Sequence, residues 1–519
     1  MRFSITRLCL AATLAAGVCE SSPVFKLKQG LQGVLGDIKQ GIETTEDAGN
    51  DERPLVDSET LQSLITEDSL RLREEKLLEI AGASNSTFGH PTRVIGSKGH
   101  WKTVGYIKRE LKRLGGYYKV RVQPFKAFYG EVFSYNATIN GTYLETVGPM
   151  DMSPATEDKK PAVGRLLAVA GYGCNVSEYP ENAEGSVLLI KRGQCSFGDK
   201  SALSGKVGAQ AAIIYNNEAG AVRGTLGVPS KHTRFIPTVA LSQAEGERYV
   251  ALLGKGEVLR ASVSVDSFVG IVHTVNVIAE TREGDPGNVV MLGAHSDSVA
   301  AGPGINDDGS GTVSLLEVAK QLSKFKVNNK VRFAWWAAEE EGLLGSNFYA
   351  ETLRPDQNSQ IRVFMDYDMM ASPNYEYEVY DANNVDNPNG SQQLRDLYID
   401  YYKQHDLNYT LIPFDGRSDY VGFIDHGIPA GGIAAGAEKN NVFNGGVLDR
   451  CYHQRCDDLS NLAYDAFIVN TRLIAHSVAT YARSFKGFPE REPLPELGAL
   501  ENSSAPSSRF KYRASKLVM

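Results

Sequence analysis

The sequence predicts an α/β fold with a mixed, mostly parallel sheet and helices on both faces, interrupted by a small β-rich domain. The near-continuous apolar runs Val289–Ala294, Val331–Ala338 and Ile361–Met365 are typical of strands that are buried on both faces. Apolar residues at helical spacing lie between these runs, as from Leu315 to Leu322. Residues 140–264 differ, because many glycines there separate short Val, Ile and Leu runs, which indicates an inserted domain.

Before the insert, the chain predicts two helices and then short strands. The spacing of leucine and isoleucine indicates a helix over 58–80, and a second helix is expected over 100–114, before a pair of glycines. β-rich runs follow at 118–122 and 131–139. These elements lead into the sheet of the larger domain.

The length of 519 residues favours more than one domain, since single cores rarely grow past about 300 residues. We expect 56–139 and 265–488 to form one discontinuous domain around the insert. Residues 20–55 lack a clear pattern and are expected to be a pro-segment or a flexible N-terminus. Residues 489–519 are rich in Pro, Glu and Ser and are expected to be a flexible tail.

The N-terminus has the layout of a secretory signal peptide, which we assign to residues 1–19. Arg2 and Arg7 precede an uncharged, mostly apolar run from Leu8 to Cys19. This run is too short for a membrane helix, which needs about 20 residues, and no membrane span is expected elsewhere. The protein is therefore expected to be secreted, or alternatively delivered to a vacuole, because both routes begin in the same way.

Four of the six cysteines remain after removal of the signal peptide. Pairs Cys174–Cys195 and Cys451–Cys456 are the simplest of three possible connectivities. Seven N-x-S/T sequons are candidate glycosylation sites: Asn85, Asn136, Asn140, Asn175, Asn389, Asn408 and Asn502.

Composition and missing motifs exclude several classes of function. Hydrophobic residues make up 42% and charged residues 22%, an ordinary globular balance. The net charge of −8 does not suggest a nucleic-acid partner. No G-x-S-x-G elbow, P-loop or H-E-x-x-H sequence occurs, which disfavours a serine hydrolase, a P-loop enzyme and the H-E-x-x-H class of metalloprotease.

Polar residues gather where the apolar runs end. They form the segments Gly293–Asp297, Gly304–Gly311, Glu339–Gly342, Asp366–Asp368 and, far downstream, Cys451–Asp457. Ligands of such sheets bind at the carboxyl ends of the strands, so we expect these segments to build one site.

Each segment alone has an ordinary structural explanation. Asp307 and Asp308 resemble a helix N-cap, and Glu339–Glu341 resembles an acidic helix start. His295 and His453 could each be a structural histidine. Clustered carboxylates repel one another unless they are neutralised, and two divalent cations would neutralise them. Imidazole and carboxylate ligands suit Zn²⁺, although Mn²⁺ and Co²⁺ are chemically allowed.

These segments resemble the co-catalytic dinuclear zinc aminopeptidases, especially the fungal secreted and yeast vacuolar members. The resemblance rests on AHSDS, GINDDGSG, WAAEEEGLLGS, MDYDMMASPN, DGRSDY, GIPAGG and CYHQRCDD. GYGC and KRGQCSFGDK in 160–220 are similar to the protease-associated domain that these enzymes often carry. The resemblance implies the zinc exopeptidase fold over 56–139 and 265–488, with a protease-associated insert over 140–264. It covers about four-fifths of the chain.

The resemblance also implies roles for individual residues. The metal ligands would be His295, Asp307, Glu340, Asp368 and His453. Asp307 would bridge two Zn²⁺ ions, and Glu339 would be the general base. Asp297 would orient His295, and Tyr452 would stabilise the oxyanion. Asp366 remains an alternative to Asp368, which fits the family motif better.

The expected activity is that of an extracellular aminopeptidase. Two metals would activate a bridging water, Glu339 would accept its proton, and a free N-terminus would be required of the peptide substrate. The expected substrates are peptides that begin with leucine or another apolar residue. Met369 and the 451–456 loop are candidates for lining the apolar pocket that would bind this residue. We expect a monomer. A carboxypeptidase or dipeptidase with the same metal core, or a non-catalytic receptor-like relative, is the alternative.

The short Cys451–Cys456 loop contains Tyr452 and His453. We hypothesise that its disulfide holds both residues in place; the alternative is a surface staple unrelated to catalysis. Cys174–Cys195 is expected to be structural.

Overall fold

The computed structural model describes residues 53–220, 222, 224–227 and 234–491. The predicted signal peptide, most of the 20–55 segment, most of the predicted tail and Asn502 lie outside these residues. The described residues form two compact units, one reaching to Ala127 and resuming at His273, the other comprising Phe128–Val272. The boundaries lie within β1 (Tyr118–Ile139) and β7 (Arg260–Thr281). The predicted insert, 140–264, lies within the second unit, and its bounds stay a prediction.

The first unit is built on a mixed sheet with the strand order β12-β11-β13-β10-β8-β9-β7. Its other strands are β8 (Asp285–His295), β9 (Asn329–Trp336), β10 (Ile361–Tyr367), β11 (Tyr377–Tyr380), β12 (Tyr409–Ile412) and β13 (Ala430–Ala434). The pairs β9-β8, β8-β10, β10-β13 and β11-β12 are parallel, whereas β11-β13 and β7-β9 are antiparallel. The predicted mixed, mostly parallel sheet is confirmed.

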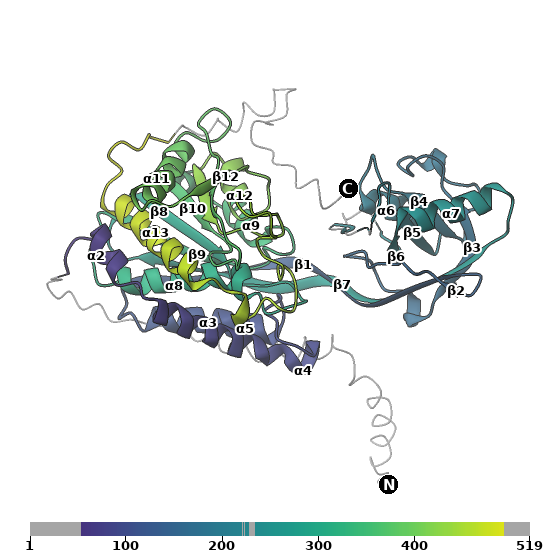
Figure 1. Cartoon of the computed structure of the whole chain (residues 1–519), viewed down its shortest axis with the longest axis horizontal. Coiled ribbons are helices and arrows are strands. Elements are labelled where there is room, and N and C mark those ends of the chain that lie inside the picture. Colours follow the sequence, from purple (N-terminus) through teal and green to yellow (C-terminus); the bar gives the residue numbers. More distant parts are fainter. Residues whose placement is uncertain (1–52, 221, 223, 228–233, 492–519) are drawn as a thin grey trace, which may run out of the picture. The chain divides into compact units, whose positions relative to one another are not determined.

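Helices cover both faces of this sheet (Figure 1). The helices of this unit are α2 (Ser58–Ser63), α3 (Glu67–Ala81), α4 (Asn85–Phe88), α5 (Lys98–Lys112), α8 (Gly311–Leu322), α9 (Leu344–Glu351), α10 (Pro355–Gln360), α11 (Ser391–Gln404), α12 (Tyr420–Asp425) and α13 (Tyr464–Arg483). α8 and α13 pack on β8 and β9, while α10 and α12 pack on the other face. Val290 and Leu292 belong to one core and Val289 and Met291 to the other, which explains why the strand is apolar throughout.

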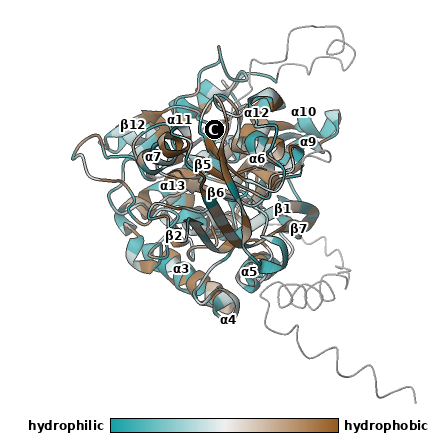
Figure 2. Ribbon diagram, turned by 90° about the vertical axis from the view of Figure 1, so that its right-hand side faces the viewer, coloured by the Kyte–Doolittle hydropathy of each residue, from teal (hydrophilic) through white to brown (hydrophobic). Residues whose placement is uncertain are grey.

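The N-terminal helices differ from expectation. Instead of one helix over 58–80, the chain forms α2 and α3, because the Thr66 side chain accepts a hydrogen bond from the Ser69 N–H and begins a new helix. Hydrophilic and hydrophobic residues share α3 along its length (Figure 2), and Leu70, Leu77 and Ile80 are buried. The expected strands at 118–122 and 131–139 are parts of the single strand β1.

The second unit is a small β-rich domain. β3 (Ala162–Ala168), β4 (Val187–Lys191), β5 (Ala211–Tyr215) and β6 (Thr238–Leu241) are parallel neighbours, and the first half of β7 pairs antiparallel with β3. β2 (Thr142–Tyr143), α6 (Phe197–Lys206) and α7 (Gln243–Gly254) complete it. The Cys174–Cys195 disulfide lies in this unit. Among the described helices, none has the length and apolar character needed to cross a membrane.

Candidate metal centre

Three neighbouring parallel strands bring the predicted site residues together. His295 is the last residue of β8, Glu339 follows β9, and Asp368 follows β10. The register aligns His295 with Trp336 and Gly293 with Asp366, so the three strands end at the same edge of the sheet.

Asp307 lies between two histidines. It belongs to the irregular helical turn Ile305–Ser310, which precedes α8. Its Oδ1 is 3.3 Å from His295 Nε2, and its Oδ2 is 3.2 Å from His453 Nε2. The two oxygens of one carboxylate therefore face two different imidazoles.

Each histidine also faces a second carboxylate. His295 Nε2 is 3.6 Å from Asp368 Oδ1, and His453 Nε2 is 3.0 Å from Glu340 Oε2. Glu339 lies beside the pair of His295 and Asp368, and its Oε2 is 3.9 Å from His295 Nε2. The five predicted ligands and the predicted base are thus brought into one cluster.

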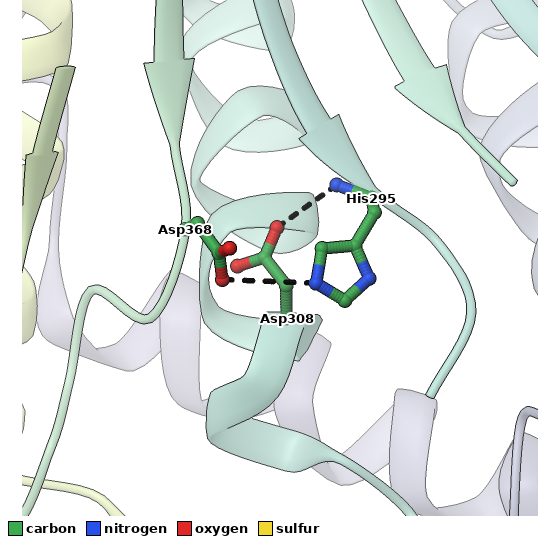
Figure 3. Close-up of side chains that lie close together, drawn as sticks. All are labelled: His295, Asp308 and Asp368. Atoms are coloured by element: carbon green, nitrogen blue, oxygen red, sulfur yellow. Dashed lines mark hydrogen bonds and ion pairs between the residues drawn. The ribbon is translucent and has the colours of Figure 1, made fainter. Parts of the chain in front are cut away.

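Asp308 also lies near His295 and Asp368 (Figure 3), close enough to be considered a ligand. Its oxygens, however, already accept backbone N–H groups: Oδ2 from His295 at 3.0 Å, and Oδ1 from Gly311 at 2.8 Å and Met369 at 3.1 Å. Asp308 therefore ties together the segments that carry the candidate ligands, and Asp307 remains the predicted metal-binding carboxylate.

Asp366 and Asp297 occupy supporting positions. Asp366 Oδ2 accepts the Tyr420 N–H at 3.0 Å. Two groups of described residues converge closely enough to hold a metal ion, and Asp366 is in neither: His295, Asp308 and Asp368 form one group, and Asp307, Glu340 and His453 the other. Asp368 Oδ2 accepts a hydrogen bond from the Ser418 hydroxyl at 3.0 Å. Asp297 Oδ1 lies 3.8 Å from His295 Nδ1, facing the side of the ring away from Asp307.

The buried polar atoms fit a pair of metal ions. His295 Nε2, Asp307 Oδ2 and Asp368 Oδ1 are buried and make no hydrogen bond with any described residue. Burial by itself would lower the pKa of His295, but the nearby carboxylates raise it well above its ordinary value. Burial raises the pKa of Glu339 well above its ordinary value. Carboxylates and imidazoles that converge without hydrogen bonds are suitable ligands for Zn²⁺.

The loop that carries Tyr452 and His453 is closed by the Cys451–Cys456 disulfide. The two rings stack with their centroids 3.8 Å apart. The Cys451 N–H donates to Asp449 Oδ1 at 2.7 Å, which fixes the start of the loop. Both side chains therefore lie on a closed loop, and the positioning role of its disulfide stays a prediction.

Sequence reasoning missed two residues that hold the segment between His295 and Asp307. Asp457 accepts the backbone N–H of Asp307 at 3.0 Å. Arg93 is fully buried and donates to the carbonyls of Pro303 at 2.8 Å, Ser296 at 2.5 Å and Gly304. Asp457 is part of the CYHQRCDD motif and could have been noticed, whereas Arg93 lies in no recognisable pattern.

A pocket opens beside the cluster. It is lined by Asp307, Glu339, Asp368, Met369, Glu378, Tyr380, Ile412, Pro413, Asp415, Arg417, Ala434, Gly436, Ala437, Lys439, Tyr452 and His453. Met369 and two residues of the 451–456 loop, all named from the sequence as pocket candidates, are among them. Apolar side chains therefore share the pocket with acidic and basic ones.

Two family models match the chain: peptidase family M28 over residues 276–478 and the PA domain over residues 162–249. The second match lies within the inserted unit, so the predicted protease-associated insert is confirmed.

Curated relatives and solved structures are similar over most of the chain. Aminopeptidase Y of Saccharomyces cerevisiae is 54% identical over 477 residues, 90% of this chain and 88% of that protein. Leucine aminopeptidase 2 of Trichophyton equinum is 41% identical over 88% of this chain and 92% of that protein. The solved structure of an aminopeptidase from Aneurinibacillus sp. strain AM-1 is 27% identical, with a TM-score of 0.69, and covers 85% of this chain and 98% of its own.

Proposed function

This chain belongs to peptidase family M28 and is an aminopeptidase, and we propose that it removes N-terminal residues from peptides with two zinc ions. The position of Asp307 supports two ions, because one of its oxygens faces His295 and the other faces His453. A bridging carboxylate between two ions would have this orientation.

We assign the ligands from the two groups of facing atoms. His295 and Asp368 would hold one ion, Glu340 and His453 the other, and Asp307 both. Asp297 would orient the ring of His295, which it faces from the opposite side. Zinc is the ion that these nitrogen and oxygen donors suit best.

The chemistry of peptide hydrolysis divides between the ions and the protein. When bound, the two zinc ions lower the pKa of the attacking water and polarise the scissile carbonyl. Glu339, which lies beside His295 without being needed as a ligand, accepts the proton of the water and delivers it to the leaving amine. The hydroxyl of Tyr452, in the same pocket, donates a hydrogen bond to the developing oxyanion.

The pocket supports a preference for leucine and other apolar N-terminal residues. Its lining includes the apolar side chains of Met369, Ile412 and Pro413 as well as candidate ligands. The carboxylates at the metal centre would bind the free α-amine, which restricts cleavage to the N-terminal residue. The signal peptide expected at residues 1–19 would direct the enzyme to the secretory route, and the proposed location is outside the cell or in a vacuole.

Metal analysis combined with peptide digestion tests the proposal. We expect two zinc ions per chain and stepwise release of residues from a leucine-rich peptide with a free N-terminus. The same peptide with an acetylated N-terminus is the matched control and should remain intact. Release of C-terminal residues from the acetylated peptide would instead indicate a carboxypeptidase, and one metal ion per fully active chain would contradict the dinuclear centre.

A further inference from the structure

We propose that Arg417 is a positioning residue for the reaction: it holds the oxygen of Tyr452 and thereby directs the hydroxyl proton of this tyrosine to the substrate. The inference rests on the proposed role of Tyr452. Arg417 comes from a segment far from Tyr452 in the sequence, and its contact gives the hydrogen bond of Tyr452 a defined direction.

Arg417 lies between Glu438 and Tyr452. Its Nη1 donates to Glu438 Oε1 at 2.9 Å, and its Nη2 donates to Glu438 Oε2 at 3.0 Å. The same Nη2 donates to the hydroxyl oxygen of Tyr452 at 3.1 Å. A two-point pair of this kind fixes the plane of a guanidinium group, so the donor that reaches Tyr452 has a defined direction.

The chemistry of the two groups sets the direction of the hydrogen bond. A guanidinium group has donors and no acceptor, so the oxygen of Tyr452 must be the acceptor. The hydroxyl proton is then left to donate elsewhere, and no described residue accepts it. Tyr452 and Arg417 both line the pocket that contains Asp307 and Glu339. A substrate oxygen in this pocket is the partner that completes the hydrogen bonding of Tyr452.

Two further contacts fix the pair relative to the metal centre. The ring of Tyr452 stacks on His453, a candidate ligand. Next to Arg417, the Ser418 hydroxyl donates to Asp368 Oδ2 at 3.0 Å, so the same segment contacts a ligand of the other ion. The pair is therefore connected to a candidate ligand of each proposed ion.

A double-mutant cycle on the zinc-loaded full-length enzyme tests this inference. The variants are Arg417→Met, Arg417→Lys, Tyr452→Phe and the double variant Arg417→Met/Tyr452→Phe, assayed with leucine p-nitroanilide. Zinc content and melting temperature are measured for each. About a third of the Arg417 side chain is exposed, so its replacement is not expected to unfold the chain. Arg395→Met, which removes another arginine that contacts two acidic residues, is the matched control.

We expect Tyr452→Phe to lower kcat about 100-fold, the effect of removing one oxyanion donor. Arg417→Met should lower kcat about 10-fold with KM nearly unchanged, and Arg417→Lys, which keeps a cationic donor, should recover part of this loss. The double variant should be no slower than Tyr452→Phe alone, because Arg417 acts through Tyr452. Arg395→Met should match the wild type.

Other outcomes would overturn the inference. If the reduction in kcat of the double variant is the product of the reductions in the two single variants, Arg417 acts on the substrate independently of Tyr452. If Arg417→Met changes only KM, it contributes to binding and not to the orientation of Tyr452. Either result would leave the proposed function intact, because the wild type would still bind two zinc ions and cleave the substrate. Failure of the proposed function would instead appear in the wild type itself. Glu438→Gln provides a second variant, expected to lower kcat less than Arg417→Met.

Discussion

Asp457 holds Asp307 in place, because its Oδ2 accepts the backbone N–H of Asp307 at 3.0 Å. Its Oδ1 accepts the N–H of Asn306 at 2.9 Å, and the side chain is almost completely buried. Asp457 directly follows Cys456, so the disulfide loop that carries His453 is joined to the turn that carries Asp307, the proposed bridging carboxylate. The geometry of the two proposed metal sites is therefore coupled through one side chain.

Asp457→Asn should weaken zinc binding by about 10- to 100-fold, as is usual for residues that orient a metal ligand. An amide can replace one acceptor oxygen but not both, and its NH₂ group would face the backbone N–H of Asn306 or Asp307. Zinc affinity is measured by competition with a chelator. Asp400→Asn, an exposed position on α11, is the control. Unchanged zinc affinity in Asp457→Asn would show that the turn keeps its shape without this carboxylate.

Glu339→Gln should lower kcat by about 10²- to 10⁴-fold and leave two zinc ions bound. Glutamine has the same shape but cannot accept the proton of the attacking water. The measurements are turnover of leucine p-nitroanilide and zinc content. Glu351→Gln, an exposed glutamate in α9, serves as control. An active, zinc-loaded Glu339→Gln enzyme would rule out the assigned base.

Replacing Cys451 and Cys456 by serine should lower kcat/KM and zinc affinity. The crosslink closes a loop of a few residues, which by chain entropy contributes about 2 kcal/mol, and the loop carries both Tyr452 and His453. The matched control replaces Cys174 and Cys195, whose disulfide lies in the inserted unit. Equal effects of the two double variants on zinc affinity would favour the alternative of a surface staple.

Glu378 should make the enzyme less stable as pH rises. Burial, followed by repulsion from Glu376, raises the pKa of Glu378 from 4.5 to about 7. Between these values the folded state binds more protons than the unfolded state, so the free energy of unfolding falls as pH increases, by up to about 3 kcal/mol. The loss is complete above about pH 7 and absent below about pH 4.5.

Glu378→Gln should remove this loss. We expect a higher melting temperature than the wild type at pH 8 and nearly the same melting temperature at pH 5. Glu257→Gln, an exposed glutamate of the second unit, should change neither. A stabilisation that is equal at both pH values would show that the effect is one of packing and not of charge.

The local pattern of residues accounts for the parts of the fold that were predicted. Strands buried on both faces need apolar residues at every position, so β8, β9 and β10 could be recognised without a structure. The helix expected over 58–80 was wrong in extent, because apolar spacing continues across residues 64–66 while the Thr66 cap interrupts the backbone hydrogen bonds.

The sequence by itself determined which polar segments meet, since parallel strands end at one edge of the sheet and place their following residues together. The roles expected of the candidate ligands and base came from the resemblance to the family motifs, because residue spacing alone left an ordinary structural explanation open for each segment. Only the tertiary structure decided what Asp308, Asp457 and Arg417 do. Their roles depend on which atoms their side chains reach, and the partners of Asp457 and Arg417 come from distant parts of the chain or from other loops.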